Sequence, residues 1–397
     1  MRIAVFASAY EPSLGGVEEL VKQLALAYQR QGHEVIVLTN QWPRELPRDE
    51  VLDGVRVFRL PFRSPVDTLK SRATYGLTTR LVSRRVRKIL ARHGTDVIHV
   101  QCISTNGLYA MRASRQMRIP IVATAQGELT MDASRLFQRD RRAQAWLRDI
   151  ATHADAFTAC SAKTLRDVED FVGRKFGDRG AVVFNGTDVQ LFATAGPYRR
   201  DRPYVFALGR LVPQKGFDIL MRAIARISDE VPIDLVLAGD GPLEPQLRAL
   251  ALELGVADRV EFFGRANRHE AAALMRGARA VVLPSRADEG LPLVSVEAMA
   301  SGTPLVATRT GGIEEAATDR LHALLVDMED EAALTHGLVE VLSDDEFGKR
   351  LGRAAQERAG RFDWGELAAE YLSVFTRAIG SSSMNSSSKD HGSAHFT

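Results

Sequence analysis

The chain has 397 residues, long enough for two domains and too long for one small module. Hydrophobic residues make up 45% of it, charged residues 26% and aromatic residues 7%, which excludes disordered, collagen-like and coiled-coil classes. No stretch approaches the roughly 18 apolar residues of a spanning helix, and the apolar start is too short for a signal peptide, so we expect a cytoplasmic protein.

The two halves of the chain carry charge of opposite sign. Residues 1–190 hold 29 lysines and arginines against 20 acidic residues, and the rest of the chain holds 23 against 30. The front half is therefore expected to face something anionic, such as a phosphorylated acceptor or a membrane surface, although solubility alone tolerates this asymmetry. Cys102 and Cys160 lie in or beside apolar runs, which favours reduced core thiols over a disulfide or a zinc site.

Short apolar runs alternate with longer amphipathic stretches, the pattern of parallel sheets covered by helices. The predicted strands of the front half are 3–7, 35–38, 55–60, 97–100, 121–124, 156–160 and 182–184. Residues 188–203 then combine prolines, a glycine and charges without periodicity. The predicted strands that follow are 204–208, 235–238, 260–263, 280–283, 305–307 and 323–326.

This order predicts an α/β protein with two Rossmann-like parallel-sheet domains in series. We assign residues 1–190 to the first domain, 191–203 to a linker and 204–363 to the second domain. A last helix is predicted at about 364–379, and the Ser-rich residues 380–397 are predicted to be disordered.

A loop with Gly15 and Gly16 follows the first predicted strand. Glycines there let backbone N–H groups approach a ligand at a helix N-terminus, and they serve plain packing equally well. A dinucleotide site requires Gly-x-Gly-x-x-Gly, and neither this loop nor Gly239-Asp240-Gly241 has the third glycine. NAD binding is therefore disfavoured.

Two cations, Arg210 and Lys215, follow the first strand of the second set. This places them at the carboxyl end of a parallel strand, where open α/β sheets bind ligands. Lys215 is predicted to open a helix, where its charge opposes the helix dipole unless an anion compensates it. The pattern favours an anion clamp over a solvated surface pair.

The most informative stretch follows the predicted strand that ends at Leu283. A loop with Glu289 and Gly290 leads into a helix expected from near Leu291, and Glu297 lies nearly two turns along it. At 1.5 Å per residue the two carboxylates are roughly 10 Å apart, room for a diphosphate. Glu289 is otherwise an ordinary helix N-terminal acid and Glu297 a solvated one, but the apolar neighbours of Glu297 favour burial with polar partners.

Together these motifs resemble the retaining glycosyltransferases of family 4, whose GT-B fold has two Rossmann-like domains facing each other across a cleft. The resemblance covers nearly the whole chain. It rests on Glu289-x7-Glu297, on Gly209-Arg210 with Lys215-Gly216, on Gly15-Gly16, on Asn185-Gly186-Thr187-Asp188 with Phe192, on Gly239-Asp240-Gly241-Pro242 and on Gly311-Gly312-Ile313-Glu314-Glu315.

The resemblance implies roles for single residues. Arg210 and Lys215 are expected to hold the donor diphosphate, and Glu297 to accept hydrogen bonds from ribose hydroxyls. Glu289, with the backbone N–H groups of Gly290 and Leu291, is expected to address the transferred sugar and the phosphates. Arg265, after residues 262–264, is expected to flank the nucleoside base, and the last helix to pack back on the first domain. The remaining residues expected at the donor are Gly15, Gly16 and Gly209.

One position departs from the family. Many relatives carry a His after the fifth strand, at the place that usually touches the donor sugar, where this chain has Gln126. Neutral hydrogen bonding survives this change and a cationic role does not. His99 is expected either to face the donor sugar or the acceptor or to be a satisfied core histidine.

The implied activity is that of a retaining, metal-independent hexosyltransferase. It would move a sugar from a nucleotide-diphosphate sugar to a lipid-linked or cell-surface polysaccharide or glycolipid precursor. No Asp-x-Asp occurs, so no metal and no other cofactor is expected. The alternatives are a GT-B sugar-nucleotide epimerase or hydrolase and a catalytically inactive carbohydrate-binding relative.

Residues 69–93 carry eight cations and no acid: Lys70, Arg72, Arg80, Arg84, Arg85, Arg87, Lys88 and Arg92. Arg80, Arg84 and Arg87-Lys88 fall on one helical face. The predicted apolar side consists of Leu77, Leu81, Val82, Val86, Ile89 and Leu90. Such a helix either binds an anionic membrane, here the inner face of the plasma membrane, or is a solvated face of a packed helix. Nucleic acid is disfavoured because aromatic residues are not interleaved with the cations.

Overall fold

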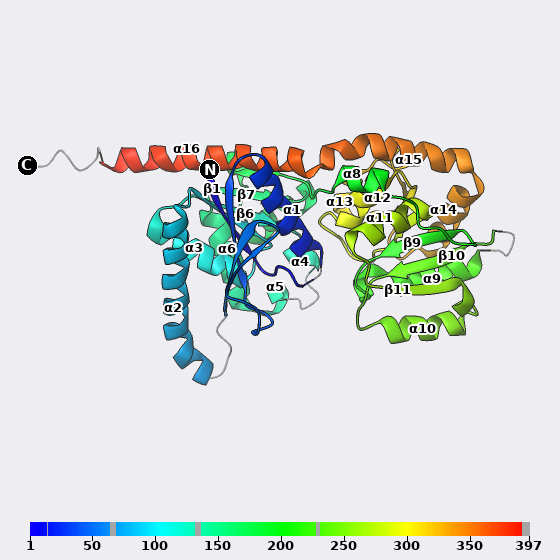
Figure 1. The fold of residues 1–397 in the computed structure, drawn as a ribbon, viewed down its shortest axis with the longest axis horizontal. Helices are drawn as coiled ribbons and strands as arrows, with labels where there is room; N and C mark the ends of the chain where they lie inside the picture. Colours follow the sequence, from blue (N-terminus) through cyan, green and yellow to red (C-terminus); the bar gives the residue numbers. More distant parts are fainter. Residues whose placement is uncertain (14, 64–68, 132–135, 228–230, 391–397) are drawn as a thin grey trace, which may run out of the picture. The chain divides into compact units, whose positions relative to one another are not determined.

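The computed structural model describes residues 1–13, 15–63, 69–131, 136–227 and 231–390. The chain divides into two compact units, each an α/β sheet with helices on both faces (Figure 1). The first unit consists of Met1–Phe184 and Trp364–Thr397, and the second of Asn185–Asp363. Two parallel-sheet α/β domains were predicted, and this architecture is confirmed.

The first unit contains an eight-stranded sheet of order β3-β4-β2-β1-β5-β6-β7-β8. Its strands pair in parallel, except that β3 runs antiparallel to β4 at the edge. The inner strands are continuous buried runs, as expected where helices cover both faces. The strand bounds are β1 (Arg2–Ala7), β2 (Glu34–Asn40), β3 (Asp49–Leu52), β4 (Val55–Leu60), β5 (Val97–Gln101), β6 (Ile121–Ala125), β7 (Ala156–Ala159) and β8 (Gly180–Val182).

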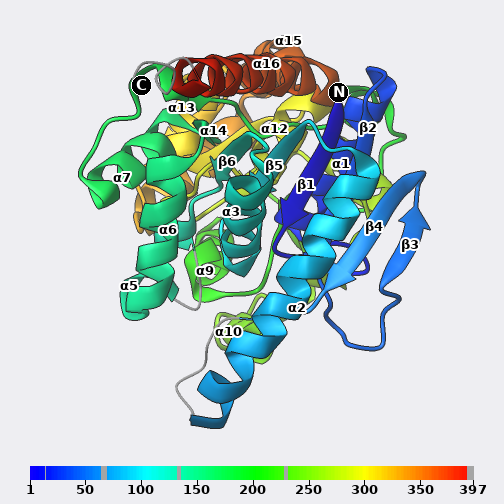
Figure 2. The ribbon, with the colours of Figure 1, turned by 90° about the vertical axis from the view of Figure 1, so that its left-hand side faces the viewer.

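Two groups of helices cover this sheet. Helices α2, α3 and α6 lie in front of the strands in Figure 2, and α1 and α16 pack on each other against the opposite face. Side-chain caps begin α6 at Asp140 and α7 at Ser161. The helix bounds are α1 (Gly16–Arg30), α2 (Leu69–His93), α3 (Thr105–Met117), α4 (Glu128–Met131), α5 (Leu136–Arg139), α6 (Arg141–His153), α7 (Ala162–Val172), η1 (Gly177–Arg179) and α16 (Trp364–Asp390).

His99 lies in the middle of β5 and its side chain is fully buried. Its Nδ1 is 3.3 Å from the hydroxyl of Tyr28 and its Nε2 is 2.9 Å from the hydroxyl of Thr124. The ring packs on Tyr371 and Phe375 of α16, with centroids 4.7 and 5.0 Å away. Burial lowers the pKa of His99 to about 3, so the ring is neutral. Of the two alternatives for this residue, the structure has the core histidine.

This buried imidazole predicts a pH-dependent stability. In the unfolded chain His99 has its ordinary pKa of 6.5, so between pH 6.5 and 3 the unfolded state binds a proton that the folded state does not. The free energy of unfolding is therefore unaffected by this proton well above pH 6.5. It decreases as the pH is lowered, by about 2 kcal/mol at pH 5. Urea unfolding at pH 7.5 and pH 5 should show a decrease about 2 kcal/mol larger in the wild type than in His99→Gln, and equal decreases would contradict the prediction.

The second unit contains a six-stranded parallel sheet of order β11-β10-β9-β12-β13-β14. Counted from β9 this is the order 3-2-1-4-5-6 of a doubly wound dinucleotide-type sheet. Its strands are β9 (Tyr204–Leu208), β10 (Asp234–Ala238), β11 (Val260–Gly264), β12 (Ala280–Leu283), β13 (Leu305–Thr308) and β14 (Leu324–Val326).

Helices α9 and α10 lie on one side of the second sheet, and α11 and α12 lie on the other (Figure 1). An Asn267–Glu270 capping box begins α11, and Gly302 ends α12 in the left-handed conformation. The helix bounds are α8 (Val189–Thr194), η2 (Pro213–Lys215), α9 (Phe217–Arg226), α10 (Glu244–Glu253), η3 (Ala257–Arg259), α11 (Arg268–Gly277), α12 (Leu293–Ser301), α13 (Gly311–Ala316), α14 (Glu331–Ser343), α15 (Asp345–Ala359) and η4 (Gly360–Phe362).

Two details differ from the sequence-based expectation. The edge strand β3 was not predicted, because its charged, half-exposed residues lack an apolar run. Helix α16 begins at Trp364 as predicted but continues to Asp390, beyond the predicted end at 379. Residues 380–390 are therefore helical where disorder was predicted, and the hydroxyl of Ser382 donates to Asp155 at 2.8 Å. Residues 391–397 lie outside the described part of the chain.

The segment predicted as a linker contains part of the second unit. The second unit begins at Asn185, and Asp188 caps α8 through the N–H of Leu191 at 2.9 Å. Phe192 of α8 is fully buried, and α8 contacts α11 and α12. Because α8 is short, no helical periodicity was visible in the sequence.

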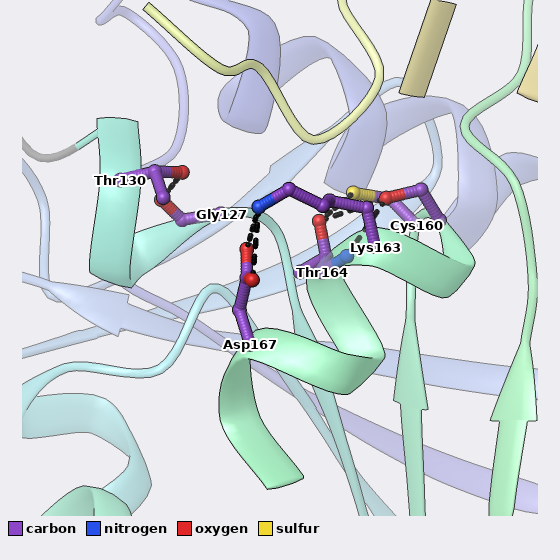
Figure 3. A network of polar contacts seen from close by, with 7 residues as sticks. Gly127, Thr130, Cys160, Lys163, Thr164 and Asp167 are labelled. Carbon is purple, nitrogen blue, oxygen red and sulfur yellow. Dashed lines mark hydrogen bonds and ion pairs between the residues drawn. The ribbon is translucent and has the colours of Figure 1, made fainter. Parts of the chain in front are cut away.

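In the described part of the chain, no helix combines the length and the apolar character needed to cross a bilayer. Neither Cys102 nor Cys160 is part of a disulfide. Cys160 is fully buried beside the hydroxyl of Thr164 (Figure 3), and Cys102 is half-buried.

Candidate functional site

The loops that follow β9 and β12 form the centre of the candidate donor site in the second unit. These two strands are neighbours in the sheet. The helix after β9 lies on one side of the sheet, and the helix after β12 lies on the other (Figure 1). Open α/β sheets bind ligands at this reversal, outside the carboxyl ends of the strands. The backbone N–H of Arg286 donates to the carbonyl of Gln214 at 3.0 Å, which ties the two loops together.

Lys215 and Glu289 meet across this reversal. The Nζ of Lys215 is 2.7 Å from Oε2 of Glu289, whose other oxygen accepts the hydroxyl of Ser285. The Glu289 side chain is 4% exposed and that of Lys215 is 19% exposed, so little solvent screens the pair. One ammonium N–H is directed at Glu289, and an ammonium has three.

The sequence had suggested that Lys215 opens an α-helix, and the structure differs. It ends the short η2 turn, Gly216 follows with a φ of 64°, and α9 begins at Phe217. A left-handed glycine breaks the helical path, and an alanine Cβ there would lie 2.0 Å from the carbonyl oxygen of Pro284. Gly216 thus lets the lysine loop lie directly against the loop after β12.

Helix α12 carries the second predicted carboxylate. It begins at Leu293, two residues later than predicted, with Pro292 as its N-cap and no side-chain cap. Gly290, Leu291 and Glu297 are all buried. The side-chain amide of Asn185 donates to the carbonyl of Leu291 at 2.8 Å and holds the entry to the helix. Asn185 was part of the quoted motif, but its role at this loop was not predicted.

Two further predicted cations lie on loops at the carboxyl edge of the same sheet. Arg210 follows Gly209 after β9, and its side chain is exposed. Arg265 follows β11, and its guanidinium donates to Asp240 at 2.7 Å, which raises the pKa of Arg265. Among the predicted donor residues, Lys215 and Glu289 are in direct contact in the described part of the chain.

The glycine loop of the first unit ends at the start of α1. Gly15 is the N-cap, Gly16 is the first helical residue, and both are exposed. The loop is held from β4 by Arg59, which is 1% exposed, pairs with Glu50 at 2.7 Å and donates to the carbonyl of Glu11. Sequence reasoning missed Arg59, although a cation within a buried strand is a signal for such a structural role. Leu14 lies outside the described residues.

Gln126 directly follows β6 and is half-buried. Its Nε2 donates to Oε1 of Gln101 at 3.1 Å, and its backbone N–H donates to Glu128 at 2.8 Å. Glu128 is buried and also accepts the N–H of Ile103 at 2.6 Å, and burial raises its pKa. Glu128 therefore joins the loops after β5 and β6, a role that sequence reasoning missed.

The helix that follows β7 carries its own polar pair near this loop. Figure 3 shows Gly127, which follows β6, and Thr130 of α4 together with Lys163 and Asp167 of α7. The hydroxyl of Thr130 donates to the carbonyl of Gly127 at 3.4 Å, and Lys163 pairs with Asp167 at 2.9 Å.

Helix α2 differs from its predicted packing. Val82, Val86, Ile89 and Leu90 are buried as predicted, but Leu77 and Leu81 are 66% and 59% exposed. They share a helical stripe with Arg80, Arg84 and Lys88, which are also exposed. We call Leu77, Arg80, Leu81, Arg84 and Lys88 the α2 stripe. The side chains of Lys70 and Arg72 lie outside the described residues.

Within the described residues, no three His, Cys, Asp or Glu side chains gather in a way that would hold a metal ion.

Two family models cover most of the chain. The Glycosyltransferase Family 4 model matches residues 14–191, and the Glycosyl transferases group 1 model matches residues 194–358. The phosphatidyl-myo-inositol mannosyltransferase of Mycobacterium tuberculosis is 30% identical over 377 residues, which cover 92% of this chain and 94% of that protein. The chain belongs to glycosyltransferase family 4. This confirms the resemblance on which the site residues were assigned.

Other relatives and structures agree with the family. The D-inositol 3-phosphate glycosyltransferase of Xylanimonas cellulosilytica is 30% identical over 397 residues, covering 92% of each chain. Sucrose-phosphate synthase of Thermosynechococcus elongatus superposes with a TM-score of 0.79 at 24% identity, over 96% of this chain and 99% of that one. An Anabaena protein solved with UDP-glucose gives 0.74 at 21% identity, over 94% and 99%. The glycosyltransferase thus has the GT-B fold.

The closest backbone approach at the donor loops gives a steric prediction. A Cβ on Gly312, in α13, would lie 1.5 Å from the carbonyl oxygen of Gly290. Gly312→Ala should therefore lower the stability by about 2 kcal/mol, as overpacking does, although alanine favours helices. At this domain size the Tm should fall by at least about 4 °C in calorimetry.

The matched control for this variant is Gly380→Ala in α16, where a Cβ meets nothing within 4 Å. The same exchange there should raise the stability by about 0.5–1 kcal/mol. Equal Tm values for the two variants would mean that the donor loops tolerate separation.

Proposed function

We propose that this glycosyltransferase moves a sugar, with retention of configuration and without a metal ion, from a nucleotide-diphosphate sugar to a hydroxyl of a phosphate-bearing acceptor. The observation that carries the proposal is the Lys215–Glu289 pair at the reversal point of the second sheet. The Lys215 ammonium, the buried Glu289 carboxylate and the start of α12, which has no side-chain cap, lie close together on adjoining loops. A cation and a helix N-terminus bind a diphosphate, and a carboxylate binds sugar hydroxyls.

Each residue has a role in the proposal. Lys215, with two N–H donors beyond the one directed at Glu289, binds the diphosphate together with Arg210. Glu297 accepts hydrogen bonds from the ribose, and Arg265 lies beside the base. Glu289 and the N–H groups of Gly290 and Leu291 address the sugar and the phosphates. The glycines Gly15, Gly16 and Gly209 let the backbone approach the donor.

In the proposed reaction, the bond between the anomeric carbon and the diphosphate oxygen breaks as the acceptor oxygen bonds to that carbon on the same face. The departing phosphate oxygen takes the acceptor proton. Negative charge grows on the diphosphate, and fixed cations and helix N–H groups stabilise it without reorganisation. The Lys215 ammonium is held in advance by Glu289, so it is oriented before the bond breaks.

The acceptor is proposed to be a lipid-linked precursor of a polysaccharide or glycolipid at an anionic membrane. Relatives with about 30% identity are named for phosphatidyl-myo-inositol and for inositol 3-phosphate, both of which carry phosphate. The excess of cations in residues 1–190 and the α2 stripe support this choice. Exposed leucines beside arginines are what an interfacial helix requires.

Lys215→Ala is predicted to lower turnover at least a hundredfold, about 3 kcal/mol, because one preorganised cation is lost. Lys215→Arg should recover part of this, since a planar fork replaces a compact ammonium. Product formation would be measured with UDP-glucose, GDP-mannose and UDP-N-acetylglucosamine, in EDTA and with Mg²⁺ or Mn²⁺. EDTA should have no effect on the wild type.

Lys349→Ala is the matched control, because Lys349 pairs with Glu346 on the exposed surface of α15. It should turn over normally. Loss of wild-type activity on chelation, restored by metal, would overturn the metal-free mechanism, and normal turnover by Lys215→Ala would overturn the diphosphate clamp. Sugar release without transfer to any acceptor would favour a hydrolase.

Leu77→Ser with Leu81→Ser is predicted to reduce binding to phosphatidylglycerol vesicles at least fivefold, because the apolar part of the α2 stripe is removed. Neutralising Arg80, Arg84 and Lys88 to Gln should have a similar effect that added salt imitates. Leu252→Ser is the control, since Leu252 is 72% exposed on α10. Vesicle sedimentation that does not distinguish the stripe variants from Leu252→Ser would refute the membrane assignment.

A further inference from the structure

The end of β5 carries a buried amide that has no assigned role. Gln101 is the last residue of β5, and its side chain is fully buried. Strand β6 lies beside it in parallel, with Gln101 opposite Thr124, and Gln126 follows two residues later. Both glutamines therefore lie at the carboxyl edge of the first sheet, beside the point where the chain turns to opposite sides of β1 and β5.

The two ends of the Gln101 amide have different partners. Its Nε2 donates to the hydroxyl of Tyr371 at 3.3 Å and lies 3.1 Å from Nε2 of His99. The neutral His99 ring offers a lone pair there when its proton is on Nδ1, beside Tyr28. Because its N–H end is held in this way, Gln101 directs its oxygen at Gln126.

The orientation of Gln101 determines that of Gln126. Oε1 of Gln101 accepts from Nε2 of Gln126 at 3.1 Å, and a reversed Gln126 amide would bring two oxygens together. The backbone of Gln126 is fixed separately, by its N–H bond to the buried Glu128. Gln126 thus directs its carbonyl oxygen, which can only accept hydrogen bonds, away from Gln101.

We propose that Gln101 is a positioning residue for transfer: it orients Gln126 so that the carbonyl oxygen accepts a hydroxyl proton from a bound sugar, and Tyr371 of α16 holds Gln101 in place. This inference rests on the proposed transferase function. A sugar hydroxyl is the partner that fits, because Gln126 has no charge and the orientation favours a donor. The hydroxyl belongs to the donor sugar or to the acceptor.

The test is a double-mutant cycle of Gln101→Met and Gln126→Met. The donor is the one that the wild type uses among UDP-glucose, GDP-mannose and UDP-N-acetylglucosamine. Both single variants and the double variant would be assayed for hydrolysis of this donor and for sugar transfer to phosphatidylinositol vesicles. Methionine keeps the length of the side chain but replaces the amide with a thioether, which donates no hydrogen bond and accepts only weakly. Gln101→Met should lower kcat/KM at least tenfold, leave UDP and GDP affinity within twofold, and add less than twofold to the loss caused by Gln126→Met.

Further variants separate positioning from stability. Tyr371→Phe removes one hydroxyl and should lower kcat/KM about threefold. This milder variant tests the same contact if Gln101→Met folds poorly. Gln101→Glu keeps an oxygen for Gln126 and should recover part of the loss. Gln356→Met, which removes an amide that donates to Ala300 in the second unit, is the control and should be active.

The outcomes are distinct. A loss in both hydrolysis and transfer assigns the hydroxyl to the donor sugar, and a loss in transfer alone assigns it to the acceptor. Multiplicative losses in the cycle, or full activity of both Gln101→Met and Tyr371→Phe, would overturn the inference while the transferase proposal stands. A wild type that neither hydrolyses nor transfers from any nucleotide-diphosphate sugar would overturn both.

Discussion

Direct contact between backbones at the carboxyl edge of the second sheet is the constraint on which the donor loops depend. A Cβ on Gly239 would lie 1.9 Å from the carbonyl oxygen of Gly209, and Gly216 and Gly312 lie just as close to the loop after β12. No side chain fits between these loops, so they form one layer of fixed backbone. Lys215 and Glu289 meet at 2.7 Å on loops whose backbones lie directly against each other. In the first unit, buried polar groups do the equivalent work, with Arg59 and Glu128 bonded to the loops.

The fold was largely predictable because most strands are apolar runs that helices cover on both faces. Where burial is one-sided, the signal fails. Strand β3 was missed because its residues alternate in exposure and begin with two acids. Leu77 and Leu81 were assigned to the packed side of α2. The helix buries only a narrower stripe of that side, which contains Val82 and Val86. A sequence pattern gives the apolar face of a helix and does not give how much of that face the neighbouring elements cover.

The candidate site was predictable where chemistry and motif coincide, and less so where it depends on local backbone conformation. Glu289 and Lys215 were predicted at loops that follow strands of the second sheet, and they lie there in contact. The turn that joins Lys215 to α9 depends on a left-handed glycine that periodicity does not reveal. The partnership of Gln101 and Gln126 was out of reach, because it requires the register of two strands whose residues are far apart in sequence. Residues that hold functional groups in place carry a weaker sequence signal than the groups themselves.

The first unit is discontinuous in sequence, and this has a consequence for its synthesis. The sheet that buries His99 is complete once residue 184 has been made, but Tyr371 and Phe375, which cover His99, come from beyond the whole second unit. During translation the second unit, which is continuous, has all its residues available first. One face of the first sheet therefore waits, with part of its apolar and polar core uncovered, until α16 leaves the ribosome. The nascent chain is exposed to aggregation and to chaperones at that face for the time it takes to translate the second unit.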